Sequence, residues 1–280
     1  MKFDIREAAQ SKLLVVAHRG VFGGNIPCNT LASYEIALKQ GADMIETDVN
    51  VTADGELIVF HPGMESAHLN AQISLPEMEW SEVSKLRFVN IDNVSTQFGI
   101  LKFDDFLEHF KDRCFINVDK FWSNPEKIYR TLKRHEMLDQ VVVKAPPTAR
   151  VLDILENVAP ELAYMPVVKI HFQEHEALMK RNVNYVGVEA LFYDDDDPIA
   201  SKAFVGQLHG DGKLMWANSI IYDHEQQIAA GHSDDTALTV SEDLGWGWLA
   251  DRGFDLIQTD WPMMLIDYLK RTQKYYKVKT

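Results

Sequence analysis

Short apolar runs alternate with longer segments of helical periodicity along most of this chain. Eight runs have the composition and length of a buried strand. They lie at residues 13–17, 44–49, 114–118, 141–144, 164–168, 186–189, 214–217 and 256–259. A helical segment follows each run or a short way beyond it, at residues 30–40, 104–111, 125–135, 148–158, 173–181, 198–208, 242–252 and 262–271. Because alternating strands and helices predict parallel strands joined by crossover helices, eight such units predict an α/β fold, the TIM (β/α)8 barrel.

One segment interrupts this alternation after the second strand. Residues 52–55, Thr-Ala-Asp-Gly, have the composition of a tight turn, and a short apolar run at 57–60 follows. A stretch rich in Ser and Glu then continues to about residue 99. We expect a small insertion at about residues 53–99 that caps the catalytic face of a single domain spanning residues 1–280.

The charge and the composition of the chain limit the kinds of partner that it can bind. The net charge of −14 predicts repulsion of nucleic acid and of anionic membranes, so we expect no nucleic-acid partner and no stable membrane association. The N-terminus lacks an apolar signal region, and no apolar run is long enough to span a bilayer. The two cysteines, Cys28 and Cys114, have no metal-ligand spacing, which is typical of a reduced, cytoplasmic protein. We therefore expect a small-molecule substrate, and the sequence leaves the oligomeric state open.

Polar residues occupy the ends of the predicted strands, where active sites of (β/α)8 barrels lie. They are His18, Glu46, Asp48, Asp119, Lys144, Glu189, Trp216 and Asp260. Glu46 and Asp48 are two residues apart in one strand, so their side chains point to the same face. Asp119 can complete a site with only oxygen ligands, which favours Mg²⁺ or Ca²⁺ over zinc and does not choose between them.

Two histidines flank this acidic pair along the chain. His18 and His61 each follow an apolar run, and they are candidate proton carriers. Arg19 suits an anionic oxygen, most naturally that of a phosphate. A cation, two acid–base groups and a phosphate ligand together indicate phosphodiester cleavage. The remaining histidines lie mainly in helical or loop contexts, and we expect six of them at the surface: His68, His109, His135, His175, His224 and His232.

The chain resembles the glycerophosphodiester phosphodiesterase family over nearly its whole length, and three motifs carry this resemblance. They are His18-Arg19-Gly20 with Asn29-Thr30, then Glu46-x-Asp48-Val49-x-x-Thr52-x-Asp54-Gly55-x-x-Ile58-x-x-His61, and a closing segment at residues 253–262. The resemblance implies a TIM barrel, a divalent metal held by Glu46 and Asp48 with a third carboxylate, and acid–base catalysis by His18 and His61. It also implies attack by the substrate's own neighbouring hydroxyl through a cyclic phosphate, followed by hydrolysis.

Four positions depart from the family pattern, and they indicate a divergent subfamily. The family has Glu at the position of Cys28 and Asp at the position of Pro62. It has Glu at the position of Asp119 and Lys at the position of Phe121. Lys120 would point to the other face if its strand continued. Lys144 on the next strand is therefore the better substitute for the missing lysine.

We predict metal-dependent hydrolysis of a small, water-soluble glycerophosphodiester to glycerol phosphate and an alcohol. Arg19, Lys144 and Trp216 are the predicted substrate-binding residues. One alternative is a phospholipase C- or D-like lyase that releases a cyclic phosphate, and an exposed aromatic or apolar rim would favour it. The other alternative is a non-catalytic binding protein on the same barrel.

Overall fold

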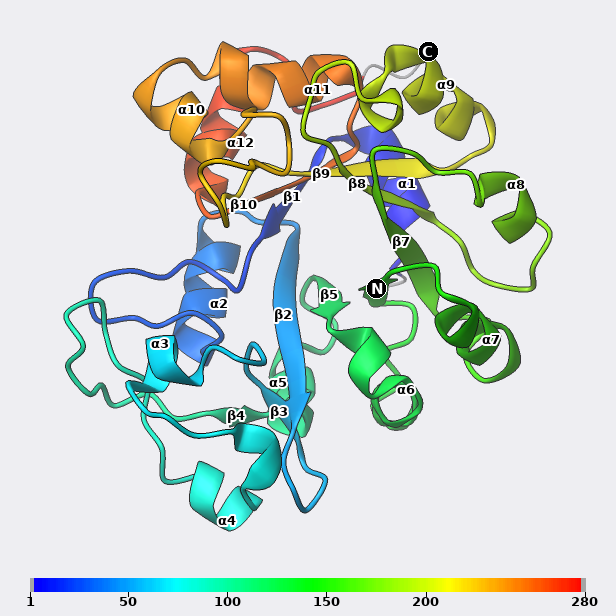
Figure 1. Ribbon diagram of the computed structural model, residues 1–280. Helices are drawn as coiled ribbons and strands as arrows, with labels where there is room; N and C mark the ends of the chain where they lie inside the picture. Colours follow the sequence, from blue (N-terminus) through cyan, green and yellow to red (C-terminus); the bar gives the residue numbers. More distant parts are fainter. Residues whose placement is uncertain (1–2, 278–280) are drawn as a thin grey trace.

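Eight parallel strands close into a barrel in the computed structural model, which describes residues 3–277 (Figure 1). They are β1 (Leu14–Ala17), β2 (Met44–Val51), β5 (Phe115–Asp119), β6 (Val141–Ala145), β7 (Ala163–Lys169), β8 (Gly187–Leu191), β9 (Leu214–Asn218) and β10 (Leu256–Thr259). The barrel is closed because β1 pairs in parallel with both β2 and β10. The predicted TIM barrel is therefore confirmed, and each predicted strand lies within three residues of an observed one at both ends.

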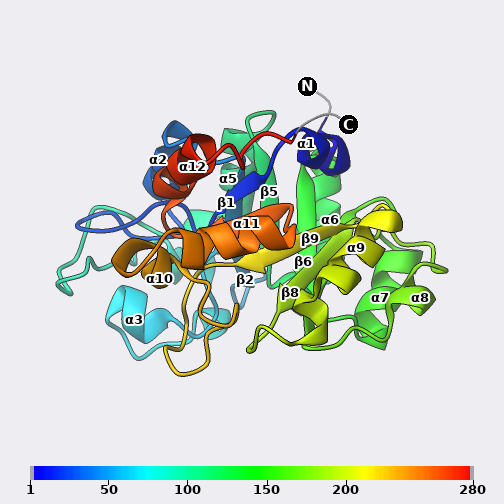
Figure 2. The same ribbon diagram turned by 90° about the horizontal axis from the view of Figure 1, so that it is seen from above.

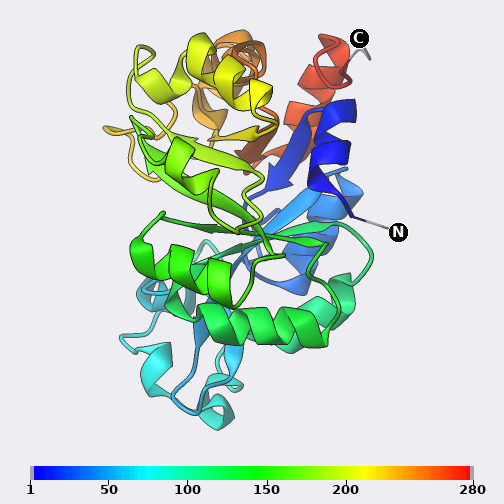
Figure 3. The same cartoon turned by 90° about the vertical axis from the view of Figure 1, so that its right-hand side faces the viewer.

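Helices surround the barrel, as the views from above and from the side show (Figures 2 and 3). Those that follow the barrel strands are α2 (Leu31–Lys39), α5 (Phe103–Phe110), α6 (Pro125–Arg134), α7 (Ala149–Asn157), α8 (His175–Leu178), α9 (Lys202–Gly210), α11 (Trp248–Arg252) and α12 (Pro262–Arg271). Outside the segment after β2, the described residues form two further helices that were not predicted, α1 (Ile5–Ser11) and α10 (Asp234–Thr239). The prediction at 173–181 was too long, and those at 198–208 and 242–252 begin with a 3-10 turn and a π turn.

Two apolar layers follow from the alternation of side chains along the strands. Val16, Met44 and Met165 point into the barrel, where they form an inner core with residues from the other strands. Val15 and Ile45 point outward and pack against the helices in the larger core. Because inward-facing positions near the C-terminal strand ends are polar instead of apolar, they line a site at that end of the barrel.

The segment after β2 forms the predicted insertion. Its strands β3 (Leu57–Val59) and β4 (Leu101–Lys102) extend the end of β2 as an antiparallel ribbon. Three short helical segments lie between these strands: α3 (Glu65–Leu69), η1 (Leu75–Glu77) and α4 (Trp80–Val83). The insertion has a small core of its own, which contains Ile58, Phe60, Leu69, Leu75, Val83, Phe88 and Ile100.

The helices of the described chain are too short or too polar to be membrane spans. Among residues 3–277, none reaches the length and hydropathy that crossing a bilayer requires.

Candidate active site

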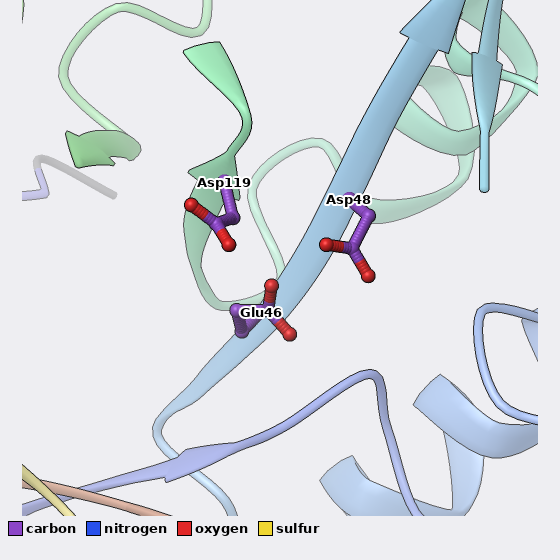
Figure 4. A group of neighbouring side chains, drawn as sticks. All are labelled: Glu46, Asp48 and Asp119. Atoms are coloured by element: carbon purple, nitrogen blue, oxygen red, sulfur yellow. The ribbon is translucent and has the colours of Figure 1, made fainter. Parts of the chain in front are cut away.

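Three carboxylates converge at the C-terminal end of the barrel. Glu46 and Asp48 point inward from β2, and Asp119 ends the neighbouring strand β5, where it lies opposite Asp48 in the strand register (Figure 4). Each residue offers one oxygen, and these oxygens lie within 4.8 Å of one another. The structure thus brings together the three residues that the sequence analysis selected as metal ligands.

The electrostatics of this cluster suit a bound cation. Burial, and then the charges of Asp48 and Asp119, raise the pKa of Glu46 to about 8. The Oδ1 atom of Asp48 is buried and has no hydrogen-bond partner among residues 3–277. A buried carboxylate oxygen without a donor is costly unless a cation satisfies it. The residues present therefore fit a hard divalent cation bound through oxygen.

A sharp turn after β1 holds two of these carboxylates in place. The backbone N–H of Arg19 donates to Glu46 Oε2 at 2.9 Å, and its side-chain Nε lies 2.9 Å from Asp48 Oδ2. Asn29 Nδ2 also donates to Asp48 Oδ2, at 3.0 Å, and Asn29 Oδ1 accepts from Tyr34 Oη at 2.7 Å. Arg19 and Asn29 both have left-handed backbone conformations, with φ of 54° and 56°. The His-Arg-Gly and Asn-Thr motifs are therefore parts of one scaffold for the acidic pair.

His18 is fixed between two polar side chains. Its Nδ1 lies 2.8 Å from Asp260 Oδ1, and because a carboxylate only accepts, the imidazole donates its proton there. This leaves Nε2 as an acceptor, and Tyr222 Oη lies 3.2 Å from it. The sequence singled out Asp260 only as a polar residue at a strand end, and Tyr222 was missed because it lies in the irregular segment after β9.

His61 follows β3, and its Nε2 atom points toward the carboxylates. Its Nδ1 lies 2.9 Å from the backbone oxygen of Pro62, and its Nε2 lies 3.9 Å from Asp48 Oδ1. Burial is the main cause that lowers the pKa of His61. The backbone oxygen of Pro62 orients the ring, a function that any residue at position 62 can perform.

Lys144 is buried inside the barrel. Its Nζ donates to Glu189 Oε1 at 3.1 Å and to Gln258 Oε1 at 3.0 Å, and it stands 4.3 Å from the centre of the Trp216 ring. Trp216 is fully buried in the inner core, and its Nε1 donates to Asn218. The Trp216 ring has no exposed surface in this structure and packs against Lys144, so its contact with a substrate stays a prediction.

Lys120 is the basic residue that the sequence analysis placed wrongly. The strand ends at Asp119, and Lys120 adopts a left-handed conformation with φ of 59°. Its Nζ therefore turns back into the site, 2.7 Å from Asp119 Oδ2 and 4.0 Å from Asp48 Oδ1. Burial opposes ionisation of Asp119, but Lys120 and Lys144 prevail and lower its pKa. Phe121 is buried in the outer core instead.

Cys28 and His68 form a pair beside this centre. His68 Nε2 lies 3.8 Å from the buried Cys28 Sγ, and the His68 ring stands edge-on to Phe60. Burial lowers the pKa of His68 to about 4, and the Arg19 charge adds to this effect. His68 is only half-buried, because α3 of the insertion turns it toward the barrel. The expectation of a surface position is wrong for His175, which is buried.

Comparisons with known proteins agree with the sequence motifs. A sequence profile for a domain of unknown function, DUF4996, matches residues 164–269. The glycerophosphodiester phosphodiesterase of Caldanaerobacter subterraneus subsp. tengcongensis is 28% identical over 161 residues, which cover 54% of this chain and 65% of that protein. The glycerophosphodiester phosphodiesterase of Bacillus subtilis is 30% identical over 148 residues, which cover 45% of this chain and 48% of that protein. The chain therefore spans less than two thirds of the length of each of these curated relatives.

Solved structures show the same fold over nearly all of the chain. A Parabacteroides distasonis glycerophosphoryl diester phosphodiesterase matches with a TM-score of 0.77 at 15% identity, over 100% of this chain and 95% of that chain. An Oleispira antarctica phosphodiesterase, solved with the product sn-glycerol-3-phosphate, matches with a TM-score of 0.69 at 20% identity, over 92% and 97% of the two chains. The chain is therefore distantly similar in sequence to glycerophosphodiester phosphodiesterases, and it shares the fold of solved structures that carry this name.

Proposed function

We propose that this protein hydrolyses glycerophosphodiesters to glycerol phosphate and an alcohol with the help of a divalent cation, Mg²⁺ or Ca²⁺. The observation that carries the proposal is the convergence of Glu46, Asp48 and Asp119 beside two histidines, each of which is oriented by a hydrogen bond at its Nδ1 atom. The glycerol phosphate bound to the Oleispira antarctica relative supports this class of product.

The three carboxylates would hold the cation, and Arg19 and Lys120 would face the phosphate. The cation would supply Lewis-acid stabilisation of charge at phosphorus and lower the pKa of a substrate hydroxyl. The guanidinium of Arg19 and the ammonium of Lys120 would stabilise the same developing charge. Burial and the two neighbouring carboxylates raise the pKa of Glu46, and the charges of Arg19 and Lys144 offset part of that rise.

His18 is the better candidate for the general base. Its Nδ1 proton is donated to Asp260, so Nε2 carries no proton and would accept one from the attacking hydroxyl of the substrate, in place of the Tyr222 hydroxyl that lies 3.2 Å away. His61 would then protonate the leaving alcohol through its own Nε2, and the Asp48 carboxylate, 3.9 Å away, partly offsets the burial that lowers the pKa of His61. Water would open the cyclic phosphate with the two roles exchanged.

Phosphorus NMR of glycerophosphocholine turnover, with Mg²⁺, Ca²⁺ or a chelator, tests the reaction directly. His18→Ala and His61→Ala should each lower kcat by about 10²–10⁴-fold, which is the usual contribution of a positioned proton carrier. His171→Ala, a substitution of an exposed histidine, serves as the matched control. Glu46→Gln should weaken cation binding in a calorimetric titration.

The same spectra separate the two alternatives. A cyclic phosphate that accumulates without further hydrolysis would favour the lyase. Absence of turnover of any glycerophosphodiester with either cation, in a folded protein, would overturn the proposal and favour the non-catalytic binding protein.

A further inference from the structure

An apolar groove lies beside the candidate active site. Its cavity has a volume of about 250 Å³ and is lined by Val21, Phe22, Gln40, Asp260, Trp261, Met263 and Met264. Phe22, Trp261, Met263 and Met264 are 44%, 50%, 55% and 41% exposed. Four large apolar side chains so close together on an acidic chain form a patch that water solvates poorly. Among the described residues that line the groove, Asp260 is the only charged one, so the occupant should be apolar.

The groove is continuous with the proposed catalytic machinery. Asp260 lines it and also orients His18 through the 2.8 Å contact. Trp261 follows Asp260 directly, and α12 begins at the next residue. The opposite wall, Val21 and Phe22, belongs to the turn that carries Arg19, and Val21 is fixed by a hydrogen bond to Ser33 at 2.8 Å. Both walls therefore come from segments that carry site residues.

We propose that this groove binds a single acyl chain on the glycerol of the substrate, so that the substrates include 1-acyl glycerophosphodiesters, the lysophospholipids. This inference rests on the proposed function, because the acyl chain is placed relative to a phosphate at the three carboxylates. It explains an exposed apolar rim that cleavage of a small, water-soluble diester does not require. It also gives a physical basis for the lipid-cleaving alternative that the sequence left open.

The chemistry restricts the substrate to lipids with one chain. The neighbouring hydroxyl of the glycerol attacks phosphorus, its proton passes to His18, and the bond from phosphorus to the headgroup oxygen breaks as that oxygen takes a proton from His61. Water then opens the cyclic phosphate to an acylglycerol phosphate. A diacyl phospholipid has an ester in place of the attacking hydroxyl, so it should be inert.

A chain-length series tests the groove. We would measure kcat/KM for glycerophosphocholine and for its 1-butanoyl, 1-hexanoyl and 1-octanoyl derivatives below their micelle concentrations. Burial of one methylene contributes about 0.8 kcal/mol, which corresponds to about fourfold in kcat/KM for full burial. We expect a rise of about two- to fourfold per methylene in the wild type. Trp261→Ala should reduce the rise to less than 1.5-fold per methylene.

Controls separate this inference from the proposed function. Trp261→Ala should leave glycerophosphocholine turnover unchanged, and Met264→Ser provides a second variant if Trp261→Ala does not fold. Met179→Ala is the matched control, because Met179, at the end of α8, is also 41% exposed and does not line the groove. If wild-type kcat/KM does not depend on chain length while glycerophosphocholine is cleaved, the groove inference is overturned and the proposed function survives.

Two further outcomes are informative. Turnover of diacylphosphatidylcholine would contradict the single-chain substrate. A Trp261 effect that appears only above the micelle concentration, together with binding to phosphatidylcholine vesicles, would assign the patch to a lipid surface and overturn the acyl-chain proposal. Failure of all these substrates, glycerophosphocholine included, would count against the proposed function itself.

Discussion

Replacing Asp260 by Asn tests whether a carboxylate behind His18 serves catalysis. Asp260 Oδ1 lies 2.8 Å from His18 Nδ1, and the substitution keeps the size of the side chain while it removes the charge. In the proposed mechanism this charge would stabilise the imidazolium that forms when His18 takes a proton. An amide also has a donor that can face Nδ1, and this would favour the tautomer with its proton on Nε2, which cannot act as the base.

The size of the effect follows from the exposure of the pair. Two unit charges with centres about 4 Å apart interact by about 1 kcal/mol in water and about 4 kcal/mol near a protein surface. The His18 side chain is only 7% exposed, whereas that of Asp260 is 32% exposed, so solvent screens part of the interaction. We therefore expect a loss of about 1–3 kcal/mol, which lowers kcat by about 5- to 150-fold. This is less than the loss expected for His18→Ala.

The assay is kcat and KM for glycerophosphocholine in the single and double variants. Because Asp260 would act through His18, His18→Ala with Asp260→Asn should be no slower than His18→Ala alone. KM should stay within about twofold, and the downfield NMR signal of the Nδ1 proton should disappear in Asp260→Asn. Asp267→Asn, at an exposed position of α12, is the control. An equal loss for Asp260→Asn in the presence and absence of His18 would refute this reasoning.

Two further predictions concern the turns that hold the site. Gly20→Ala should destabilise the fold by about 2–4 kcal/mol in urea unfolding, because Gly20 has φ of +80° and a Cβ there would lie 2.5 Å from the carbonyl carbon of Ser33. Gly206→Ala in α9 has open space around the new Cβ and should stabilise by about 0.5–1 kcal/mol; equal effects of the two variants would contradict this explanation. Lys120→Met should lower kcat by about 10–100-fold while calorimetric cation affinity rises, because Lys120 Nζ competes for Asp119. Weaker cation binding in that variant would show that Lys120 supports the cation site instead.

The barrel could be predicted from the sequence because its signal is repeated. Each strand has a buried apolar run, and each is joined to the next by a helix, so an error in one unit does not change the topology. The boundaries that failed depend on contacts between distant segments. The π turn at Asp243–Gly247 is an example, because a Cβ on Gly245 would lie 2.7 Å from Ala237, and one on Gly247 would lie 2.3 Å from Tyr268 Oη. A sequence pattern contains no record of such close approaches.

Some residues of the candidate site could be predicted from the sequence, and others could not. Glu46 and Asp48 converge with Asp119 because strand periodicity and parallel register fix where inward side chains lie, and both can be predicted from local sequence. Tyr222 and His68 reach the site from irregular or inserted segments, whose paths are decided by tertiary packing. No periodic signal marks either residue, so sequence analysis missed Tyr222 and placed His68 at the surface.

Lys120 and Phe121 show why a departure from a motif can leave the chemistry in place. The family lysine stands two residues after the third carboxylate, and this chain has Phe121 there. One left-handed residue at the end of β5 turns Lys120 toward Asp119 and lets Phe121 enter the outer core. A left-handed conformation at a non-glycine residue costs about 1–3 kcal/mol, and the ion pair with Asp119 and the burial of Phe121 both offset that cost. The site is thus defined by which atoms meet in space, and a cation beside Asp119 is retained although the spacing of the motif is not.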